Sequence, residues 1–598
     1  MTAGTGLRAL LAALLMGSVA PAQDAGAAPA WAEGPLSCIV VPALSSIQRL
    51  PDTSSPDGRL GTLLRVVAAR GEFEPASFVI APRSDVVSLV LEASALSGDG
   101  GTIASDHVDI KVVKCWYQGG TAWYSYFGDS DRRELTPELL LHDERLVRVD
   151  REKKENYLRV GGEYRWISYP KAEATEPFIY LTEPVADSAA LRPIRLKKGE
   201  NKQIWVTVHV PKSAAAGLYR GTIALAADGR RVGAMDLAVR VLPFELPLPK
   251  TYYNADLDYL VTLYSTGVLD ICRRLGVPRE AADRQQKAIY KNLLEHNVFN
   301  CRADLALARR KDRAQAIADL RHELRMMKAA GFVMKPLISR GWAYPAGEKS
   351  IEEYKARIDA LAETLVAEVG HRDVYITSWD EAGVSRIKIM RERAVHTTAN
   401  GIKLWVTTHR GRHFDLAGYC IDFANHGGWP DRERVGTWHA LGAKVASYAG
   451  PHTGPENPDI FRRLEGLARY KAYYDGSFNY KYYSALHPSL YKRYKQNVWN
   501  DFMGGAFRPM NLVYPTSNGV VDTLAWEGFR EGIDDVRYAT RLKHDAAKAI
   551  ATGKVQAVYT AKKALMWLEL LDAKTADLNA ARMEMIEHIL KIRAATEK

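Results

Sequence analysis

The second half of the chain alternates short apolar runs with helical patterns, and this alternation restricts the possible folds more than any other feature. Alternating strands and helices are typical of parallel β/α units, and eight such units form a (β/α)8 TIM-type barrel. A doubly wound sheet is the main alternative, but it would need a Gly-rich phosphate turn after its first strand, where the sequence has none. We therefore predict a barrel over residues 250–500. Its candidate strands are residues 252–259, 298–303, 334–339, 374–379, 402–408, 419–424, 444–449 and 477–482.

The clearest helix of the predicted barrel lies between its third and fourth strands. Ser350 and Glu353 have the spacing of a capping box, in which each side chain bonds the other's backbone N–H. Gly370 supplies the expected C-terminal stop. The apolar face between these signals consists of Tyr354, Ile358, Leu361 and Leu365.

The preceding residues, 31–248, predict an antiparallel β-sandwich. Apolar and polar side chains alternate along residues 203–210, a period of two that indicates a half-buried strand. Asp228-Gly229 lies between two strand-like runs and is a strong hairpin signal. Residues 116–195 are polar and aromatic, which predicts an insertion or long loops. Residues 242–249 contain three prolines and predict a stiff linker into the barrel.

The two ends of the chain differ from these regions. Residues 501–598 predict a hairpin followed by helices over 525–546, 557–572 and 576–596. At the other end, Arg8 precedes an apolar stretch and small residues, a pattern typical of a secretory signal peptide over residues 1–22. We therefore expect a secreted or periplasmic protein.

Composition excludes several classes of protein. The 598 residues are 47% hydrophobic and 25% charged, so the chain is neither disordered nor collagenous. Five cysteines are too few for a disulfide scaffold, and no apolar run after the signal is long enough to span a membrane. The formal charge of +11 is spread along the chain among acidic residues, so we expect a solvated basic surface and no nucleic-acid partner. No cofactor or metal motif is present, and the oligomeric state stays open.

The carboxyl ends of barrel strands form the active face of this architecture. At these ends the predicted strands place polar and aromatic side chains, a combination suited to a sugar, whose CH faces stack on rings while its hydroxyls form hydrogen bonds. The candidate substrate-binding residues are Asp256, Asp258, Arg302, Arg340, Trp342, Trp379, His409, Asn425, His426, Tyr448, Tyr480 and Tyr482.

Asp380 and Glu381 are the strongest catalytic candidates because they directly follow the fourth predicted strand. Two carboxyls held together raise the pKa of one of them, which makes a general acid available near neutral pH. Ordinary retaining glycosidases need two carboxyls on opposite sides of the scissile bond, about 5–5.5 Å apart, and adjacent residues do not easily straddle a sugar. The seventh strand, a common source of the second carboxylate, offers none.

An alternative mechanism uses the substrate's own 2-acetamido oxygen as the nucleophile. One carboxylic acid then protonates the leaving oxygen, and its neighbour orients and polarises the acetamide N–H. Adjacent Asp and Glu residues suit these two roles.

The strand end Ser378-Trp379-Asp380-Glu381 resembles glycoside hydrolase family 123 and its larger relative, domain-of-unknown-function family 4091. Four further segments are similar to these families and extend the resemblance over most of the chain. They are GEFEP at 71–75, LTPELL at 135–140, GLYRG at 217–221 and LAWEGFREGIDD at 524–535.

The resemblance implies a β-sandwich followed by a (β/α)8 barrel, acting as a retaining exo-glycosidase on β-N-acetylgalactosaminides by substrate-assisted catalysis. Carried onto this chain, it implies that Asp380 orients the acetamide and that Glu381 is the acid/base. Relatives commonly have Asp-Glu-Pro where this chain has Asp380-Glu381-Ala382-Gly383, so we expect the following loop to differ.

We therefore predict a glycoside hydrolase that removes terminal 2-acetamido sugars from a polysaccharide or glycoconjugate. One alternative is a barrel glycosidase acting on another sugar, with Asp256 or Asp304 as the partner carboxylate. A second alternative is a non-catalytic glycan-binding protein that retains the barrel.

Overall fold

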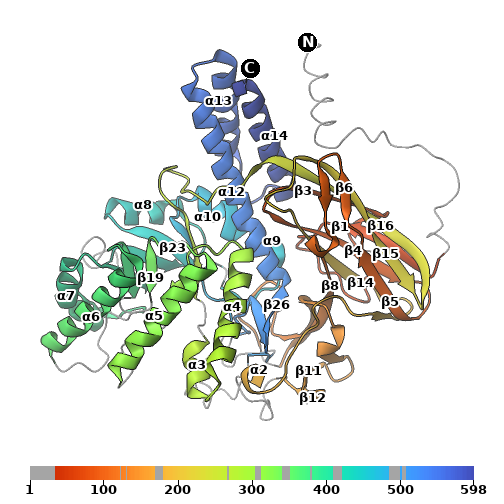
Figure 1. The fold of residues 1–598 in the computed structure, drawn as a ribbon, viewed down its shortest axis with the longest axis horizontal. Helices are drawn as coiled ribbons and strands as arrows, with labels where there is room; N and C mark the ends of the chain where they lie inside the picture. The colour runs from red at the N-terminus through yellow and green to blue at the C-terminus, as the bar shows by residue number, and fades with distance from the viewer. Residues whose placement is uncertain are drawn as a thin grey trace.

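A computed structural model shows a β-rich part, a parallel barrel and a long helical segment (Figure 1). The predicted signal, residues 1–22, lies outside the described residues. The structure describes residues 34–54, 56–121, 123–129, 131–168, 179–264, 268–303, 312–339, 350–377, 380–408, 421–450, 452–483, 498–500 and 507–597.

The first sheet joins strands from both ends of the chain. Its neighbours pair in the order β2-β1-β4-β14-β8-β9-β26-β25, all antiparallel. The expected C-terminal hairpin forms β25 and β26, and Asp522 and Thr523 of β26 pair with β9, so this hairpin extends the sheet. The strands are β1 Leu36–Val41, β2 Arg59–Leu60, β4 Phe73–Pro82, β8 Val108–Gly119, β9 Arg133–Leu141, β14 Lys202–His209, β25 Val513–Thr516 and β26 Gly519–Thr523.

The second sheet has the order β13-β5-β15-β16-β3, with β6 paired to β15 and β7 paired to β6. The predicted hairpin is confirmed, because Asp228 and Gly229 turn between β15 and β16 with φ of 50° and 78°. The β3–β16 pair is parallel, so the sheet is mixed rather than wholly antiparallel. Its strands are β3 Leu63–Arg70, β5 Val86–Ala93, β6 Leu96–Gly98, β7 Gly101–Ile103, β13 Ile194–Leu196, β15 Gly217–Ala227 and β16 Arg230–Glu245.

Strand β14 is buried along nearly its whole length, although its alternation predicted a half-buried strand. The face expected to meet solvent is covered, because Trp205 packs in a second core cluster with Trp123 and with Leu524 of the C-terminal helix. The region predicted as an insertion contributes β9 to the first sheet and a separate three-stranded sheet. The strands of that sheet are β10 Val147–Asp150, β11 Glu155–Val160 and β12 Glu163–Trp166, and α2 Ile179–Thr182 follows them.

Eight parallel strands form a nearly closed barrel in the order β17-β24-β23-β22-β21-β20-β19-β18. Between β17 and β18, the two ends of this order, Asn300 makes two hydrogen bonds to β17. Its backbone N–H donates to Val261 O (3.0 Å), and its side-chain oxygen accepts from Val261 N (3.1 Å). The strands are β17 Leu260–Leu263, β18 Arg302–Ala303, β19 Leu337–Ser339, β20 Val374–Thr377, β21 Lys403–Thr408, β22 Phe423–Gly427, β23 Lys444–Ala449 and β24 Gly476–Asn479.

Helices follow most of these strands. The predicted caps of α6 are confirmed, since Ser350 Oγ accepts from Glu353 N (3.2 Å) and Gly370 ends the helix in the left-handed region. The barrel helices are α3 Leu269–Arg274, α4 Arg279–Glu295, α5 Arg313–Ala330, α6 Ile351–Val369, α7 Val384–Ala399, α8 Arg432–Ala440, α9 Pro458–Arg463, the π-helical η6 Leu464–Ala468, and α10 Arg469–Lys471.

The position predicted for the first barrel strand, residues 252–259, is wrong. The strand is β17, four apolar residues that follow the predicted run. Tyr253, within that run, donates a hydrogen bond to Asp475, which directly precedes β24. Residues 252–259 therefore lie at the amino-terminal end of the barrel, opposite the end where sites form in this architecture.

Large side chains fill the barrel interior. One cluster takes a residue from each of seven strands, and Tyr264 packs on it from the carboxyl-terminal end. Such interior layers are typical of packed (β/α)8 barrels, so this one is a core rather than a channel. The cluster consists of Leu260, Ile338, Tyr375, Trp405, Phe423, Ala446 and Phe478.

Three helices complete the chain and form the blue bundle of Figure 1: α12 Leu524–Ala551, α13 Val555–Leu570 and α14 Leu578–Glu597. Helix α12 approaches α9 closely because it has glycines where the backbones meet. A Cβ on Gly528 would lie 2.2 Å from Pro458 O, and one on Gly532 would lie 2.6 Å from Arg462 O. The two glycines of the WEGFREG segment therefore allow this contact.

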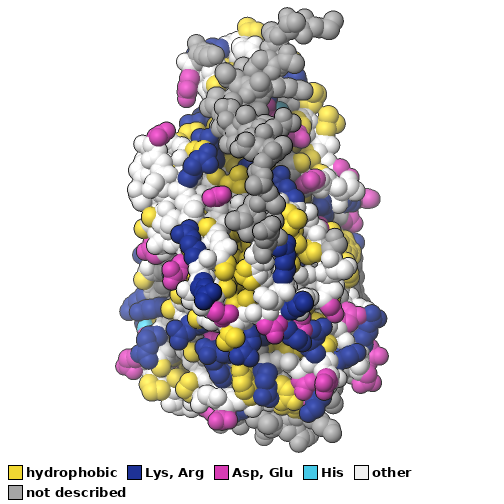
Figure 2. All heavy atoms as spheres, turned by 90° about the vertical axis from the view of Figure 1, so that its right-hand side faces the viewer, with side chains coloured by type: hydrophobic (Ala, Val, Ile, Leu, Met, Phe, Trp, Pro, Cys, Tyr) yellow, Lys and Arg dark blue, Asp and Glu magenta, His cyan; other side chains and the backbone are white. Residues whose placement is uncertain are grey.

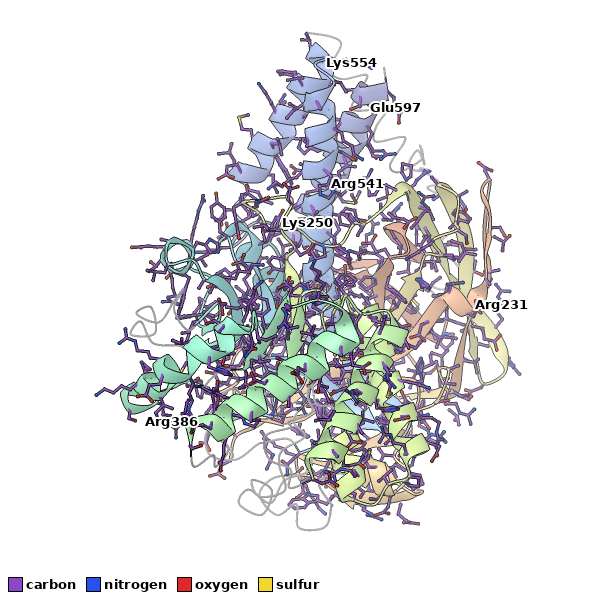
Figure 3. The ribbon with its side chains drawn as sticks, turned by 60° about the vertical axis from the view of Figure 1, so that its left-hand side comes forward. Arg231, Lys250, Arg386, Arg541, Lys554 and Glu597 are labelled. Atoms are coloured by element: carbon purple, nitrogen blue, oxygen red, sulfur yellow. The ribbon has the colours of Figure 1, made fainter. Side chains whose placement is uncertain are left out.

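The predicted linker is fixed against α12. Strand β16 continues to Glu245, and Arg537 then donates to the carbonyls of Leu246 (3.0 Å) and Pro247 (3.1 Å). The backbone N–H of Lys250 donates to Thr540 Oγ1 (3.2 Å), and Figure 3 shows Lys250 beside this helix.

A buried ionic cluster joins all three parts of the molecule. Arg582 of α14 donates to Glu74 of β4 (3.0 Å) and to Asp535 of α12 (2.6 Å). Arg462 of α9 donates to the same Asp535 (2.8 Å). Nearby, Tyr538 donates to Glu72 Oε2 (2.7 Å). The GEFEP and EGIDD segments thus serve as parts of one interface.

Burial raises the pKa of Glu72 and of Glu74, and neighbouring carboxylates raise both further. Burial also acts to raise the pKa of Asp535, but Arg462 and Arg582 outweigh it and lower that pKa. The cluster is therefore rich in acids, and its two arginines carry the compensating charge.

On the face drawn in Figure 2, Lys and Arg side chains are interspersed with Asp and Glu, a distribution typical of a solvated basic surface. Among the described residues, no helix combines the length and the apolar character needed to cross a bilayer.

We expect Arg582→Ala to lower the free energy of unfolding by about 3–5 kcal/mol, because it leaves buried carboxylates without their counter-charge. Lys591→Ala, on the same helix, removes an i,i+4 surface pair with Glu587 and should change stability by less than about 0.5 kcal/mol. Chemical denaturation followed by circular dichroism measures both. Equal losses in the two variants would contradict the structural role of the cluster.

Candidate active site

The carboxyl-terminal end of the barrel brings together side chains from several strands. They lie one step above the packed interior, because residues two apart on a strand face the same way. On β21, Thr407 lies two residues beyond Trp405 of the interior cluster and faces the same way. On β23, Tyr448 has the same relation to Ala446. Among the described residues, six that the sequence predicted for the site meet here. They are Asp380, Glu381, Arg302, Asn425, Tyr448 and Tyr480.

The backbone at Glu381 has an unusual conformation. Its φ is +43°, in the left-handed region that a non-glycine residue adopts at a cost of about 1–3 kcal/mol. Its N–H donates to Thr407 O of β21 (3.0 Å), which holds this turn against the next strand of the barrel. Asp380 and Glu381 are both exposed, whereas Ala382 is completely buried. The chain therefore presents both carboxyls to solvent from a fixed turn.

Tyr448 binds the carboxyl of Glu381. Its hydroxyl donates to Glu381 Oε1 (2.7 Å) from a buried position in β23. Burial raises the pKa of Tyr448 far above its usual value, and the hydrogen bond and charge of Glu381 raise it further. The phenol is therefore a permanent donor. Gly427 makes room for it, since a Cβ there would lie 2.7 Å from the phenol oxygen.

Tyr264, which directly follows β17, lies beside Asp380. Burial raises its pKa, and the negative charge of Asp380 raises it further. Its hydroxyl shares a hydrogen bond with Thr407 Oγ1 and accepts one from Asn425 Nδ2 (3.3 Å), while the Arg302 guanidinium lies 4.6 Å from the ring centre. Sequence reasoning missed Tyr264 because it placed the first strand too early.

His452 and Tyr126 extend the site beyond the barrel strands. The His452 ring lies 5.3 Å from Tyr448 and 4.5 Å from Tyr126, measured between ring centres. Burial lowers the pKa of His452 to about 4, although the charge of Glu381 acts in the opposite direction. Tyr126 comes from the loop after β8 of the N-terminal part, and no local pattern in the sequence could have connected it to the barrel.

A buried polar network supports the segment after β24. Tyr480 packs 5.1 Å from Tyr264, and Lys481 Nζ donates to its hydroxyl (3.0 Å). Thr453 Oγ1 accepts from Lys481 N (2.9 Å) and donates to Asn479 Oδ1 (3.0 Å). Asn479 in turn donates to the buried Glu465 (2.6 Å).

Several predicted site residues do not belong to this group. Asp256 and Asp258 precede β17 and lie at the opposite end of the barrel, where Asp258 accepts from Lys250 Nζ (2.6 Å). Tyr482 is fully buried, with its hydroxyl donating to Asn292 of α4 (2.8 Å). His426 is buried and adjoins Asn425 in β22, so it projects to the other face of the strand. Arg340, Trp342, Trp379 and His409 lie outside the described residues.

One group of described residues has the composition of a metal site: His296, Asp522 and Glu527, whose ligand atoms lie within 4.8 Å of one another. Lys111 Nζ already binds Asp522 (2.9 Å), and Arg530 binds Glu527. These two buried cations neutralise the carboxylates and would repel a metal ion. The group is therefore better explained as an ionic contact between β8, β26 and α12.

Comparison with solved structures identifies a protein of similar fold. A family 123 glycoside hydrolase from Clostridium perfringens, described in connection with glycolipid glycan hydrolysis, aligns with a TM-score of 0.59 and 13% identity, over 94% of this chain and 98% of that one. At this identity the likeness is one of fold.

Two further structures align with lower TM-scores. A Bacteroides ovatus GH5 xyloglucanase has a TM-score of 0.29 and 8% identity over 79% of this chain and 98% of that one. A Bacteroides uniformis β-glucuronidase 2 has a TM-score of 0.27 and 9% identity over 76% of this chain and 47% of that one. Neither carries an argument about this chain. No protein-family model and no curated protein matches the sequence.

We expect Tyr126→Ala to raise the pKa of His452 from about 4 toward 6.5, because it uncovers one side of the ring. An NMR titration of the histidine side chains measures this shift, with the signal assigned from His452→Gln. His588 packs on Trp567 in the C-terminal bundle (5.0 Å), so its titration should not change.

The same low pKa makes stability depend on pH. The unfolded chain protonates His452 near pH 6.5 while the folded chain does not, so the protein loses stability as pH falls from 6.5 toward 4. A wild-type pKa near 6.5 would contradict the packing described.

Proposed function

We propose that this protein is a retaining glycoside hydrolase that removes terminal 2-acetamido sugars, such as β-N-acetylgalactosaminides, by substrate-assisted catalysis. The observation that carries the proposal is the pair Asp380 and Glu381 at the carboxyl-terminal end of the barrel, with Tyr264 beside the first carboxyl and Tyr448 bonded to the second. The shared fold with a family 123 glycoside hydrolase supports it. We also propose export through residues 1–22, which would bring the enzyme to extracellular glycans.

In the first step, protonated Glu381 gives its proton to the glycosidic oxygen as the bond from that oxygen to C1 breaks. The acetamide oxygen of the substrate attacks C1 and forms a cyclic oxazolinium ion, while Asp380 accepts a hydrogen bond from the acetamide N–H. In the second step, Glu381 takes a proton from water, whose oxygen opens the ring at C1. The two inversions at C1 together retain its configuration.

Among the described residues, two further acids near this end of the barrel are held in buried ion pairs. Glu456, the first carboxylate after β23, is buried in an ion pair with Arg508, and Glu465 is buried in an ion pair with Arg469. Asp256 lies at the wrong end of the barrel for the alternative two-carboxylate mechanism, and Asp304 lies outside the described residues. A mechanism that needs only the adjacent pair is therefore favoured.

We expect Glu381→Gln to lower kcat/KM by about 10²–10⁴-fold on a glycan, because it removes the general acid. The loss should be smaller on a dinitrophenyl glycoside, whose leaving group departs without protonation. Asp380→Asn should lower both rates, since it weakens the orientation of the acetamide. Asp258→Asn is the matched control, because its carboxyl pairs with Lys250 at the opposite end of the barrel.

Chromogenic assays on purified variants measure these rates, and thermal unfolding confirms that the variants are folded. Undiminished hydrolysis by Glu381→Gln would contradict the assignment of the acid. Rapid turnover of a substrate with a 2-hydroxyl in place of the 2-acetamido group would contradict substrate assistance. Binding of a glycan without turnover by the wild type would favour the non-catalytic alternative.

We expect Tyr448→Phe to lower kcat/KM by about ten-fold or more, because a hydrogen bond to a charged group contributes about 1.5–3 kcal/mol. The phenol holds the Glu381 carboxyl in place and does not bind the substrate, so the loss should fall on kcat rather than on KM. Tyr219→Phe is the control, since that hydroxyl donates to Ala215 O (2.9 Å) in the second sheet of the N-terminal part. An unchanged kcat, or a loss confined to KM, would contradict a positioning role for Tyr448.

A further inference from the structure

Three aromatic rings lie together at the edge of the candidate site, and two of them are open to solvent. Phe127 is 48% exposed and Phe507 is 38% exposed. Their ring centres are 5.4 Å apart, and that of Tyr126 lies 4.1 Å from Phe127 and 6.2 Å from Phe507, nearly parallel to the latter. We call Tyr126, Phe127 and Phe507 the outer platform. Exposed rings gathered in one place are typical of a binding surface.

The outer platform is continuous with Glu381. Tyr448 donates to Glu381 Oε1, His452 packs on Tyr448, and Tyr126 packs on His452. After that hydrogen bond, the two remaining contacts are between rings, whose centres lie 5.3 Å apart for Tyr448 and His452 and 4.5 Å apart for His452 and Tyr126. The series leads from the proposed acid/base outward, whereas Asp380 has Tyr264 as its neighbour.

A buried ion pair holds the platform rigid. Arg508 pairs with Glu456, which also accepts from the backbone N–H of Trp123 (2.7 Å), and Arg508 Nη1 donates to Gly454 O (2.9 Å). Segments from the N-terminal part, from the loop after β23 and from the segment before β25 are thereby tied together. Phe127 and Phe507 also form a β-bridge.

The position of Tyr126 in the platform depends on a close backbone approach. A Cβ on Gly454, whose φ is +142°, would lie 2.5 Å from Tyr126 Cβ. Rings held in this way lose little freedom when they bind a ligand, which favours affinity.

We propose that the outer platform binds the sugar units on the leaving-group side of the cleaved bond, so that the N-terminal part of the chain selects extended glycans. This inference rests on the proposed function. A general acid must contact the glycosidic oxygen, and the leaving group begins at that oxygen, so the surface that continues from Glu381 lies on the leaving-group side. Aromatic faces suit the CH faces of sugar rings, and the hydroxyl of Tyr126 offers a polar contact.

The test compares Phe127→Ala, Phe507→Ala and the double variant with the wild type. The substrates are p-nitrophenyl β-N-acetylgalactosaminide, a tetrasaccharide with the same terminal sugar, and an octyl glycoside of that sugar. Both substitutions keep the backbone bridge, and Tyr559→Ala, on α13 and 59% exposed, is the matched control for loss of a surface ring. The readouts are kcat/KM for each substrate and the affinity of the tetrasaccharide for each variant combined with Glu381→Gln.

We expect the double variant to lower kcat/KM and affinity for the tetrasaccharide by about ten-fold, with turnover of the p-nitrophenyl glycoside unchanged. Equal effects on both substrates, or no effect on the tetrasaccharide, would overturn the platform and leave the proposed function intact. A loss confined to the octyl glycoside would also overturn it, because the rings would then bind an apolar chain. Failure of the wild type to cleave any substrate would overturn the proposed function and the platform with it.

Discussion

The buried ionic cluster around Arg582 is the contact on which the arrangement of the whole chain depends. It joins Glu74 of the N-terminal sheet, Asp535 of α12 and, through that aspartate, Arg462 of the barrel. Charges removed from water must be paired inside the protein, so this cluster admits one relative placement of the three parts. The geometry of the candidate site depends on the same placement, because Tyr126 contacts His452 only when the N-terminal part is held against the barrel.

The candidate site consists of a packed base and an open, polar layer. Below, bulky residues such as Trp405 and Phe478 fill the barrel interior. Above, Tyr448 donates a hydrogen bond to the exposed Glu381, and Tyr264, whose pKa is raised by burial and by the charge of Asp380, lies beside the exposed Asp380. The left-handed turn at Glu381 stores modest strain where the chemistry is proposed, as active sites commonly do.

Local signals in the sequence predicted much of this structure. The caps of α6, the Asp228-Gly229 turn and the bounds of β23 follow from side chains within a few residues of one another. The first barrel strand was misplaced because residues 252–259 contain three tyrosines, a residue type that favours strands, and β17 itself is only four residues long. That error moved Asp256 and Asp258 into the predicted site and left Tyr264 out.

By itself, the sequence determined the alternation that makes a barrel and the position of Asp380 and Glu381 at a strand end, because both depend on neighbours along the chain. Only the tertiary structure decided which rings surround those carboxyls. Tyr126 and Phe507 come from segments far apart in the sequence, and the pairing of Arg508 with Glu456 brings them together. Such contacts depend on burial and charge compensation across the whole fold, which local patterns do not encode.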